Sequence, residues 1–296
     1  MTLAAIVLAL AARTIVRNTV WGSDEDLFFN LIQTSPESAK AHYDYAYASA
    51  DLKHYRRALA HYEMATEIYE DYWDAWAGKG RMEKELGLLE DAQDSYETSI
   101  EIRSDYENGY FGLGLVREAR GDWGGAEAAY RQGLAKKADS LPLAYRLALT
   151  RARLEGAAAL PDWKRALTIG PESSAVRADF AAWLLGTGQS AQAARQAREA
   201  LRRDPACLTA LRVLARRNAR EGWKLGEALA REKAYRVSRD EEDWRELLAL
   251  ARENAAYGKR FAAVGAALRA HRVVRPVTAA PETRPSAAQP RAPQGS

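Results

Sequence analysis

A 34-residue repeat runs through the first half of the chain and constrains the fold more than any other feature. Four columns of residues recur at this spacing over three units, two of them mostly small and two mostly aromatic: Ala46, Gly80 and Gly114; Ala58, Ala92 and Ala126; Tyr62, Tyr96 and Tyr130; and His42, Trp76 and Tyr110. Four columns in register do not arise by chance, so the chain repeats one structural unit.

The spacing fits a pair of helices. Two helices of about 14 residues with two short turns fill such a unit, and no stretch shows the apolar–polar alternation of a strand. Small residues let the two helices approach closely, and the aromatic column fills the gap to the next pair. Gly87 and Gly121 fall in the turn within a pair, where a positive φ ends the first helix, and Lys53 takes this place in the first unit.

These columns resemble the tetratricopeptide repeat (TPR), so we expect an all-α, right-handed helical-repeat solenoid of about six repeats with a capping helix pair. Pro161 fits the fourth repeat only in the first turn of a helix. The predicted parts are an apolar segment (1–20), a half-repeat helix (21–36), regular repeats 1–3 (37–139), degenerate repeats 4–6 (140–239), capping helices (240–272) and a disordered Pro-rich tail (273–296).

The apolar segment has three interpretations. Its first twelve residues, MTLAAIVLALAA, are too short to span a bilayer unaided, since twelve helical residues cover only about 18 Å. The segment also resembles a signal peptide with a cleavage site at Ala9–Ala11, although the basic start is missing. It could also be the last turns of a membrane helix.

The following residues favour the membrane helix. They resemble the junction between the last membrane helix and the TPR region in membrane O-mannosyltransferases of the transmembrane-and-TPR type. The matching residues are Arg13, Thr14, Arg17, Asn18, Trp21, Glu25, Leu27, Phe28, Pro36, Ala39, Lys40, Ala41, His42 and Tyr43. The resemblance implies a half-repeat helix with Ser23 as its N-cap, and a membrane-associated chain whose TPR part is extracytoplasmic (periplasmic or lumenal), although a cytoplasmic location stays open.

Catalysis does not carry over from this family. The acidic pair and the many membrane spans of its catalytic part have no counterpart in this sequence, and no phosphate-binding, metalloprotease or Cys/His motif occurs. We therefore expect no enzyme activity, cofactor or metal. The glycines from Gly78 to Gly80 and from Gly109 to Gly114 fit tight helix packing, and His54 and His61 are expected to be ordinary exposed histidines.

Charge divides the chain into two halves. Residues 37–139 hold 21 acidic and 13 basic side chains, a net charge of −8, whereas residues 140–296 hold 28 basic and 16 acidic ones, a net charge of +12. The basic half fits either solvated helix faces, which we favour, or an anionic partner such as a lipid surface. No nucleic acid is expected as a partner.

The chain has a single cysteine, Cys207, which excludes an internal disulfide and fits a buried position.

The remaining candidate site is a groove lined by the first helix of successive repeats. The expected lining residues are Tyr43, Tyr47, Arg81, Phe111, Tyr145 and Arg146. Aromatic and arginine side chains dominate peptide-binding surfaces, although packing between repeats would also explain the tyrosines. The predicted function is a protein-interaction scaffold that binds a protein or peptide, as the non-catalytic module of a membrane glycosyltransferase. The alternative is a separate exported or membrane-anchored scaffold of a secretion or envelope complex.

Overall fold

The computed structural model describes residues 24–253. The chain divides into two compact units, Met1–Val213 and Leu214–Ser296, and each is considered by itself. Every regular element between residues 24 and 253 is helical. The apolar segment 1–20, Ser23, the second capping helix and the Pro-rich tail lie outside the described residues.

The helices follow one another with short turns, as a helical repeat requires. Their bounds are α2 (Asp24–Thr34), α3 (Ala39–Asp51), α4 (Tyr55–Ile68), α5 (Trp73–Leu86), α6 (Leu89–Ile102), α7 (Glu107–Ala119), α8 (Trp123–Lys136), α9 (Leu141–Glu155), the 3-10 turn η1 (Gly156–Ala159), α10 (Leu160–Ile169), α11 (Ser174–Gly186), α12 (Ser190–Arg203), α13 (Leu208–Arg220), α14 (Lys224–Ser238) and α15 (Glu241–Glu253). The boundary between the two units falls inside α13.

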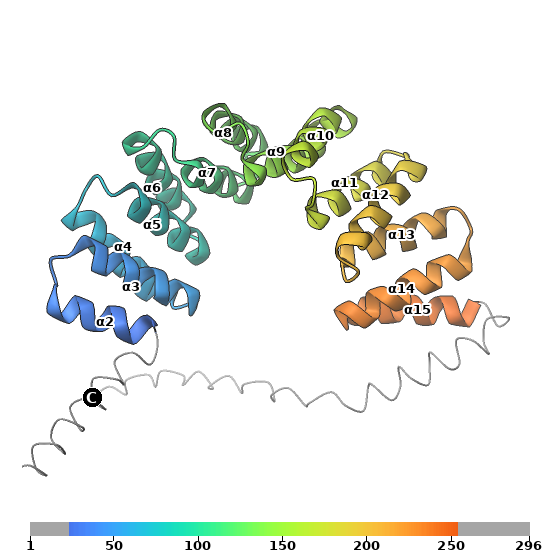
Figure 1. Ribbon diagram of the computed structural model, residues 1–296, viewed down its shortest axis with the longest axis horizontal. Coiled ribbons are helices and arrows are strands. Elements are labelled where there is room, and N and C mark those ends of the chain that lie inside the picture. The colour runs from blue at the N-terminus through green and yellow to red at the C-terminus, as the bar shows by residue number, and fades with distance from the viewer. Residues whose placement is uncertain (1–23, 254–296) are drawn as a thin grey trace, which may run out of the picture. The chain divides into compact units, whose positions relative to one another are not determined.

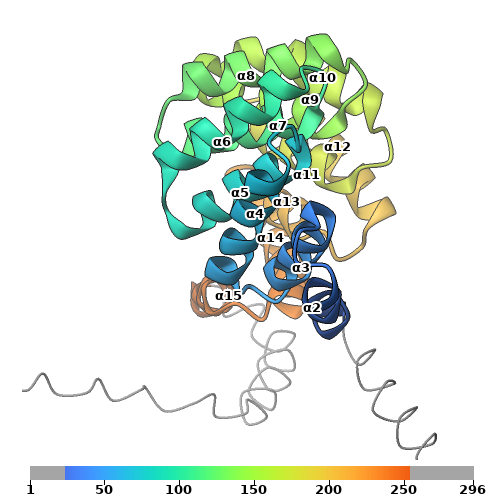
Figure 2. The same cartoon turned by 90° about the vertical axis from the view of Figure 1, so that its left-hand side faces the viewer.

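Within the first unit, each odd-numbered helix packs on the even-numbered helix that follows it. The pairs α3–α4, α5–α6, α7–α8, α9–α10 and α11–α12 stack in chain order, and α2 packs beside α3 (Figures 1 and 2). Successive first helices also touch, α3 with α5, α5 with α7, and α7 with α9. These helices therefore form one continuous side of the stack. The small column Ala58, Ala92 and Ala126 is fully buried, as predicted.

Tyrosine rings fit against glycines in both the same and the next pair. A Cβ added to Gly80 would lie 3.0 Å from Tyr96, and one added to Gly112 would lie 2.1 Å from the same ring. Tyr62 fills the corresponding space at Gly78, 2.5 Å from an added Cβ. The aromatic column therefore packs where a glycine leaves the helix surface open, which explains the small residues found two apart in α5 and α7.

The turns within the pairs have the left-handed backbone predicted for them. The φ angles are 83° at Gly87, 79° at Gly121, 84° at Gly188 and 70° at Gly222. Lys53 adopts a φ of 62° at the same place in the first pair. The turn geometry is thus kept even where the residue is not glycine.

The fourth and sixth pairs depart from the regular pattern in different ways. Pro161 lies in the first turn of α10, as predicted, after the turn η1, and α10 is only 10 residues long. The sequence pattern of the second helix in the sixth pair looks irregular, but α14 is a continuous helix of 15 residues. The second helix of this pair therefore forms even though the residues typical of the repeat are missing from it.

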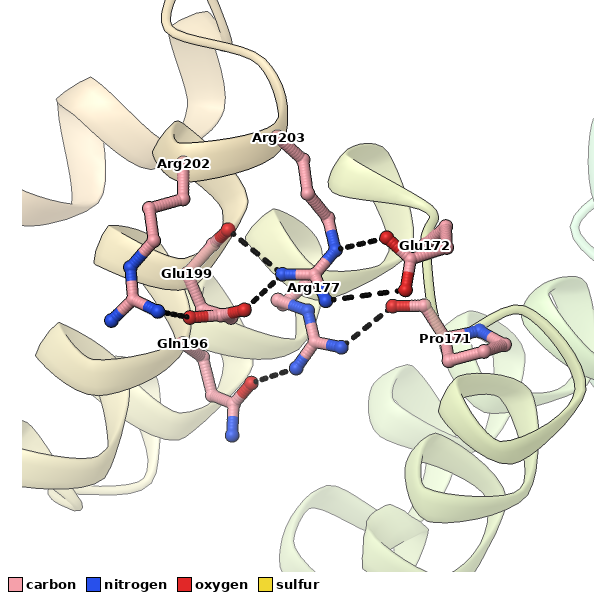
Figure 3. Close-up of polar contacts among 7 residues, drawn as sticks. All are labelled: Pro171, Glu172, Arg177, Gln196, Glu199, Arg202 and Arg203. Atoms are coloured by element: carbon pink, nitrogen blue, oxygen red, sulfur yellow. Dashed lines mark hydrogen bonds and ion pairs between the residues drawn. The ribbon is translucent and has the colours of Figure 1, made fainter.

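An arginine network links the end of α12 to the turn before α11. The Nε atom of Arg203 lies 3.0 Å from Glu172, and its guanidinium also pairs with Glu199 (Figure 3). Arg177 donates to the Pro171 carbonyl at 2.7 Å and to Gln196 at 2.9 Å. Some of the arginines in the basic half, residues 140–296, are therefore occupied by contacts within the structure. Cys207 is a free thiol and is buried, as predicted.

Candidate functional site

A pocket of 440 Å³ opens between three successive first helices of the stack. Helices α3, α5 and α7 supply most of its wall, and tyrosines from α4 and α6 reach into it from behind. The lining residues are Tyr43, Tyr47, Tyr62, Asp74, Ala77, Gly78, Arg81, Lys84, Glu85, Tyr96, Tyr106, Asn108, Phe111, Gly112 and Leu115. Its volume lies in the range of small-ligand sites, about 300–1,000 Å³.

One wall of the pocket is a cluster of tyrosine rings. Tyr43 makes an edge contact with Tyr62, with ring centroids 5.6 Å apart, and a tilted contact with Tyr72 at 5.1 Å. Tyr62 is 1% exposed, whereas Tyr47 at the rim is 48% exposed. The cluster therefore combines a buried ring, Tyr62, at the base of the pocket with an exposed ring, Tyr47, that a partner can contact.

Arg81 on α5 is placed over this cluster. Its guanidinium lies 5.8 Å from the centroid of the Tyr47 ring and within hydrogen-bonding reach of the Tyr62 hydroxyl. Helix α5 can hold the side chain there because Gly78, one turn earlier on the same helix, leaves room for the Tyr62 ring. Arg81 therefore brings a positive charge to an aromatic wall.

Burial keeps the tyrosine hydroxyls of the pocket protonated. It is the main cause that raises the pKa values of Tyr43, Tyr62, Tyr96 and Tyr106 above the usual value for tyrosine. The positive charge of Arg81 lowers the pKa of Tyr62 and Tyr96, but this effect is smaller than that of burial. All four side chains are therefore neutral hydrogen-bond donors at neutral pH.

The structure brings together four of the six residues predicted for the groove. Tyr43, Tyr47, Arg81 and Phe111 line the pocket. Tyr145 and Arg146 lie on the next first helix, α9, and do not line it. The Tyr145 hydroxyl donates to Asp179, and Arg146 lies 3.5 Å from Glu118. Both side chains already have partners between repeats.

Several lining residues were not foreseen from the sequence. Tyr62 and Tyr96 belong to the aromatic column and were expected only to pack between pairs, yet both also line the pocket. Tyr106 and Asp74 come from the starts of α7 and α5. Two further lining residues, Ala77 and Gly112, are buried. The Tyr96 ring of the preceding pair covers Gly112, and Ala77 belongs to the same buried cluster as Tyr96.

The histidine prediction is confirmed for His54, which is exposed, and wrong for His61. His61 does not stand alone on the surface: its Nδ1 atom lies 2.9 Å from Nδ1 of His42, with the two rings stacked. His42 is buried, and its Nε2 atom lies 2.9 Å from the Pro36 carbonyl oxygen in the turn after α2. Within residues 24–253, no group of three or more His, Cys, Asp or Glu side chains is placed to hold a metal ion.

Comparison with known proteins gives local sequence similarity to one class of enzyme. No family model matches the chain. It is 32% identical over 81 residues to the protein O-mannosyl-transferase TMTC1 of Mus musculus, and 28% identical over 93 residues to TMTC3 of Homo sapiens. The first match covers 27% of this chain and 9% of the mouse protein. The resemblance to O-mannosyltransferases is confirmed for this part of the chain.

Solved structures support the fold over most of the chain. The crystal structure of the APC/C hetero-tetramer Cut9–Hcn1 superposes with a TM-score of 0.63 at 14% identity, covering 76% of this chain and 45% of that one. A structure of Pseudomonas aeruginosa pilF gives a TM-score of 0.61 at 13% identity, covering 72% of this chain and 98% of that one. The chain is therefore an all-α TPR solenoid with local sequence similarity to protein O-mannosyl-transferases.

Proposed function

We propose that the chain is a protein-interaction scaffold that binds an extended polypeptide segment in the pocket between α3, α5 and α7. The observation that carries this proposal is the exposed Tyr47, the Arg81 guanidinium and Phe111 on three successive helices around one pocket. Aromatic and arginine side chains contribute most to binding energy at protein interfaces. A segment that touches all three residues crosses three repeats, which requires an extended conformation.

The proposed groove continues from the pocket toward Tyr145 and Arg146 on α9. Both side chains are partly exposed. Each would have to keep or exchange its contact with Asp179 or Glu118 when a partner binds. We expect them to contribute less than the pocket residues, because breaking an existing contact offsets part of the gain.

The proposed setting is a membrane glycosyltransferase of the O-mannosyl type. The similarity to the mouse and human O-mannosyl-transferases supports this setting. The chain would be the non-catalytic module that recruits the polypeptide substrate or a partner, associated with the membrane through residues 1–20 and extracytoplasmic. Among the described helices, none has the length and apolar character needed to cross a bilayer.

The alternative is a separate scaffold for a secretion or envelope complex. The coding sequence upstream of Met1 distinguishes the two: an in-frame series of hydrophobic helices supports a glycosyltransferase module, whereas a stop codon and a promoter support the separate scaffold. For the membrane contact, removing residues 1–20 should release the protein from salt-washed membranes. Equal membrane retention of both forms would contradict an anchor in that segment.

The binding proposal is tested by photo-crosslinking a captured peptide to the full chain. Replacing Tyr47 and Phe111 by Ala should weaken binding by about 2 kcal/mol or more in total, if they anchor the peptide. Tyr145→Ala, made separately, reports whether the groove reaches α9. Tyr69→Ala is the control, because this ring is 50% exposed and does not line the pocket. Unchanged crosslinking in a folded double variant would refute the proposed site.

A further inference from the structure

Arg81 is the basic group of the pocket that forms no ion pair within residues 24–253. Lys84 and Glu85 pair with each other at 2.5 Å, and the Asp74 carboxylate lies close enough to the Tyr106 hydroxyl to help raise its pKa, after burial. Among residues 24–253, no carboxylate forms an ion pair with Arg81. Its guanidinium has the Tyr47 ring and the Tyr62 hydroxyl as neighbours instead.

The same side of the pocket has a surplus of hydrogen-bond donors. Within the described part of the chain, the hydroxyls of Tyr43 and Tyr96 have no hydrogen-bond partner. Both are protonated at neutral pH, as burial dictates, and Arg81 adds the five N–H donors of its guanidinium. Donors without acceptors in a partly desolvated site favour a ligand that brings acceptors and negative charge.

We propose that the pocket selects polypeptide segments that carry an Asp or Glu side chain, whose carboxylate docks against Arg81. A carboxylate accepts two parallel hydrogen bonds from a guanidinium and can take further ones from tyrosine hydroxyls. This inference rests on the proposed function and specifies the residue class that the pocket recognises.

Geometry favours a side chain inside the segment over a carboxyl terminus. Tyr47 lies on α3 and Phe111 on α7, with Arg81 on α5 between them. A segment that contacts both aromatic residues therefore continues on either side of the carboxylate.

The net charge of the surrounding repeats restricts the sequence of the segment further. Residues 37–139 carry a net charge of −8, so the array repels a run of acidic residues and suits a single acid among neutral or basic neighbours.

The test uses three pools of fluorescent nine-residue peptides with blocked ends, random except for a central Glu, Gln or Lys. Binding to the full chain is measured by fluorescence anisotropy. The Glu pool should bind about tenfold more tightly than the Gln pool, in line with a charge-assisted hydrogen bond. Arg81→Glu should lower binding of the Glu pool by at least that factor and make the Lys pool the tightest.

The control is Arg56→Glu, which changes the charge equally at an exposed position on α4 outside the pocket. It should leave the order of the pools unchanged. Equal binding of the three pools that is lost in the Tyr47→Ala, Phe111→Ala variant overturns this inference and leaves the proposed function standing. Binding by no pool overturns both. Tight binding only by peptides with a free carboxyl end overturns the side-chain assignment.

Discussion

At the residue scale, the fold depends on the register between tyrosine rings and glycines. Each ring of the aromatic column packs against a neighbouring helix at a glycine, where no side chain occupies the space. Tyr96, for example, packs against Gly80 of its own pair and Gly112 of the next pair. One side chain thus fixes two interfaces, within a pair and between pairs. This is why the pocket has a rigid floor: the buried tyrosines that line it also hold the repeats together.

Gly112→Ala should lower the free energy of unfolding by about 1–3 kcal/mol, because the new Cβ would overlap the Tyr96 ring and overpack the core. Gly186→Ala is the matched control. Nothing lies within 4 Å of a Cβ at Gly186, so the better helix propensity of Ala should stabilise α11 slightly. Urea denaturation monitored by circular dichroism measures both, and equal effects would contradict the ring–glycine register.

The His42–His61 contact should make stability depend on pH. Burial, followed by the nearby His42 and Arg57, lowers the pKa of His61 below its usual 6.5. The unfolded chain therefore binds a proton at this residue at a higher pH than the folded chain does. This stability is fully present above pH 6.5, where His61 is neutral in both states, and it is lost as the pH falls from 6.5 through the lower pKa of the folded chain. Urea midpoints at pH 7.5 and 5.5 should differ more for the wild type than for His61→Asn, and an equal difference would refute this origin.

At the scale of elements, the sequence predicts the helices and turns better than it predicts the site. The positive φ at Gly87 follows from its place in the repeat, and Pro161 could fit only a first turn. The site depends on which rotamers and partners each side chain takes, and the repeat does not encode these. Tyr145 illustrates the limit: it occupies an equivalent helix, but Asp179 from the next repeat holds its hydroxyl.

In the turn between α3 and α4, Lys53 takes the left-handed position that glycine occupies in the equivalent turns. A left-handed backbone conformation costs a residue with a Cβ roughly 1–2 kcal/mol of folding free energy. Glycine avoids this cost, but it loses more conformational entropy on folding, which offsets part of the gain. Lys53→Gly should therefore raise the free energy of unfolding by about 0.5–1 kcal/mol. Gly121→Lys, the reverse change in the equivalent turn, should lower it by a similar amount. Urea denaturation checks both, and a destabilising Lys53→Gly would show that the lysine side chain contributes more than the backbone strain costs.

At the scale of the whole molecule, charge separates the proposed binding site from the basic half. The pocket belongs to α3–α7, whereas residues 140–296 carry the net charge of +12. Much of that charge is already paired in the structure, as Arg203 and Arg151 show with their carboxylate partners. Arg195 and Arg198 on α12 are exposed and form no ion pair within residues 24–253. They are the clearest sites for testing whether the basic half contributes to binding.

Reversing the charge of Arg195, Arg198 and Arg202 to Glu should change peptide affinity by less than about twofold at 0.1 M salt. Several helices separate α12 from α7 in the stack, and packed helix axes are about 8–10 Å apart. The reversed charges would therefore act across more than the screening length, which is about 10 Å at this salt concentration. Arg81→Glu, a single reversal inside the pocket, is the comparison and should have the larger effect in the same anisotropy assay. If the triple variant instead lost binding as strongly as the Tyr47→Ala, Phe111→Ala variant does, the basic half would hold the partner, because a site confined to α3–α7 cannot respond to charges at that distance.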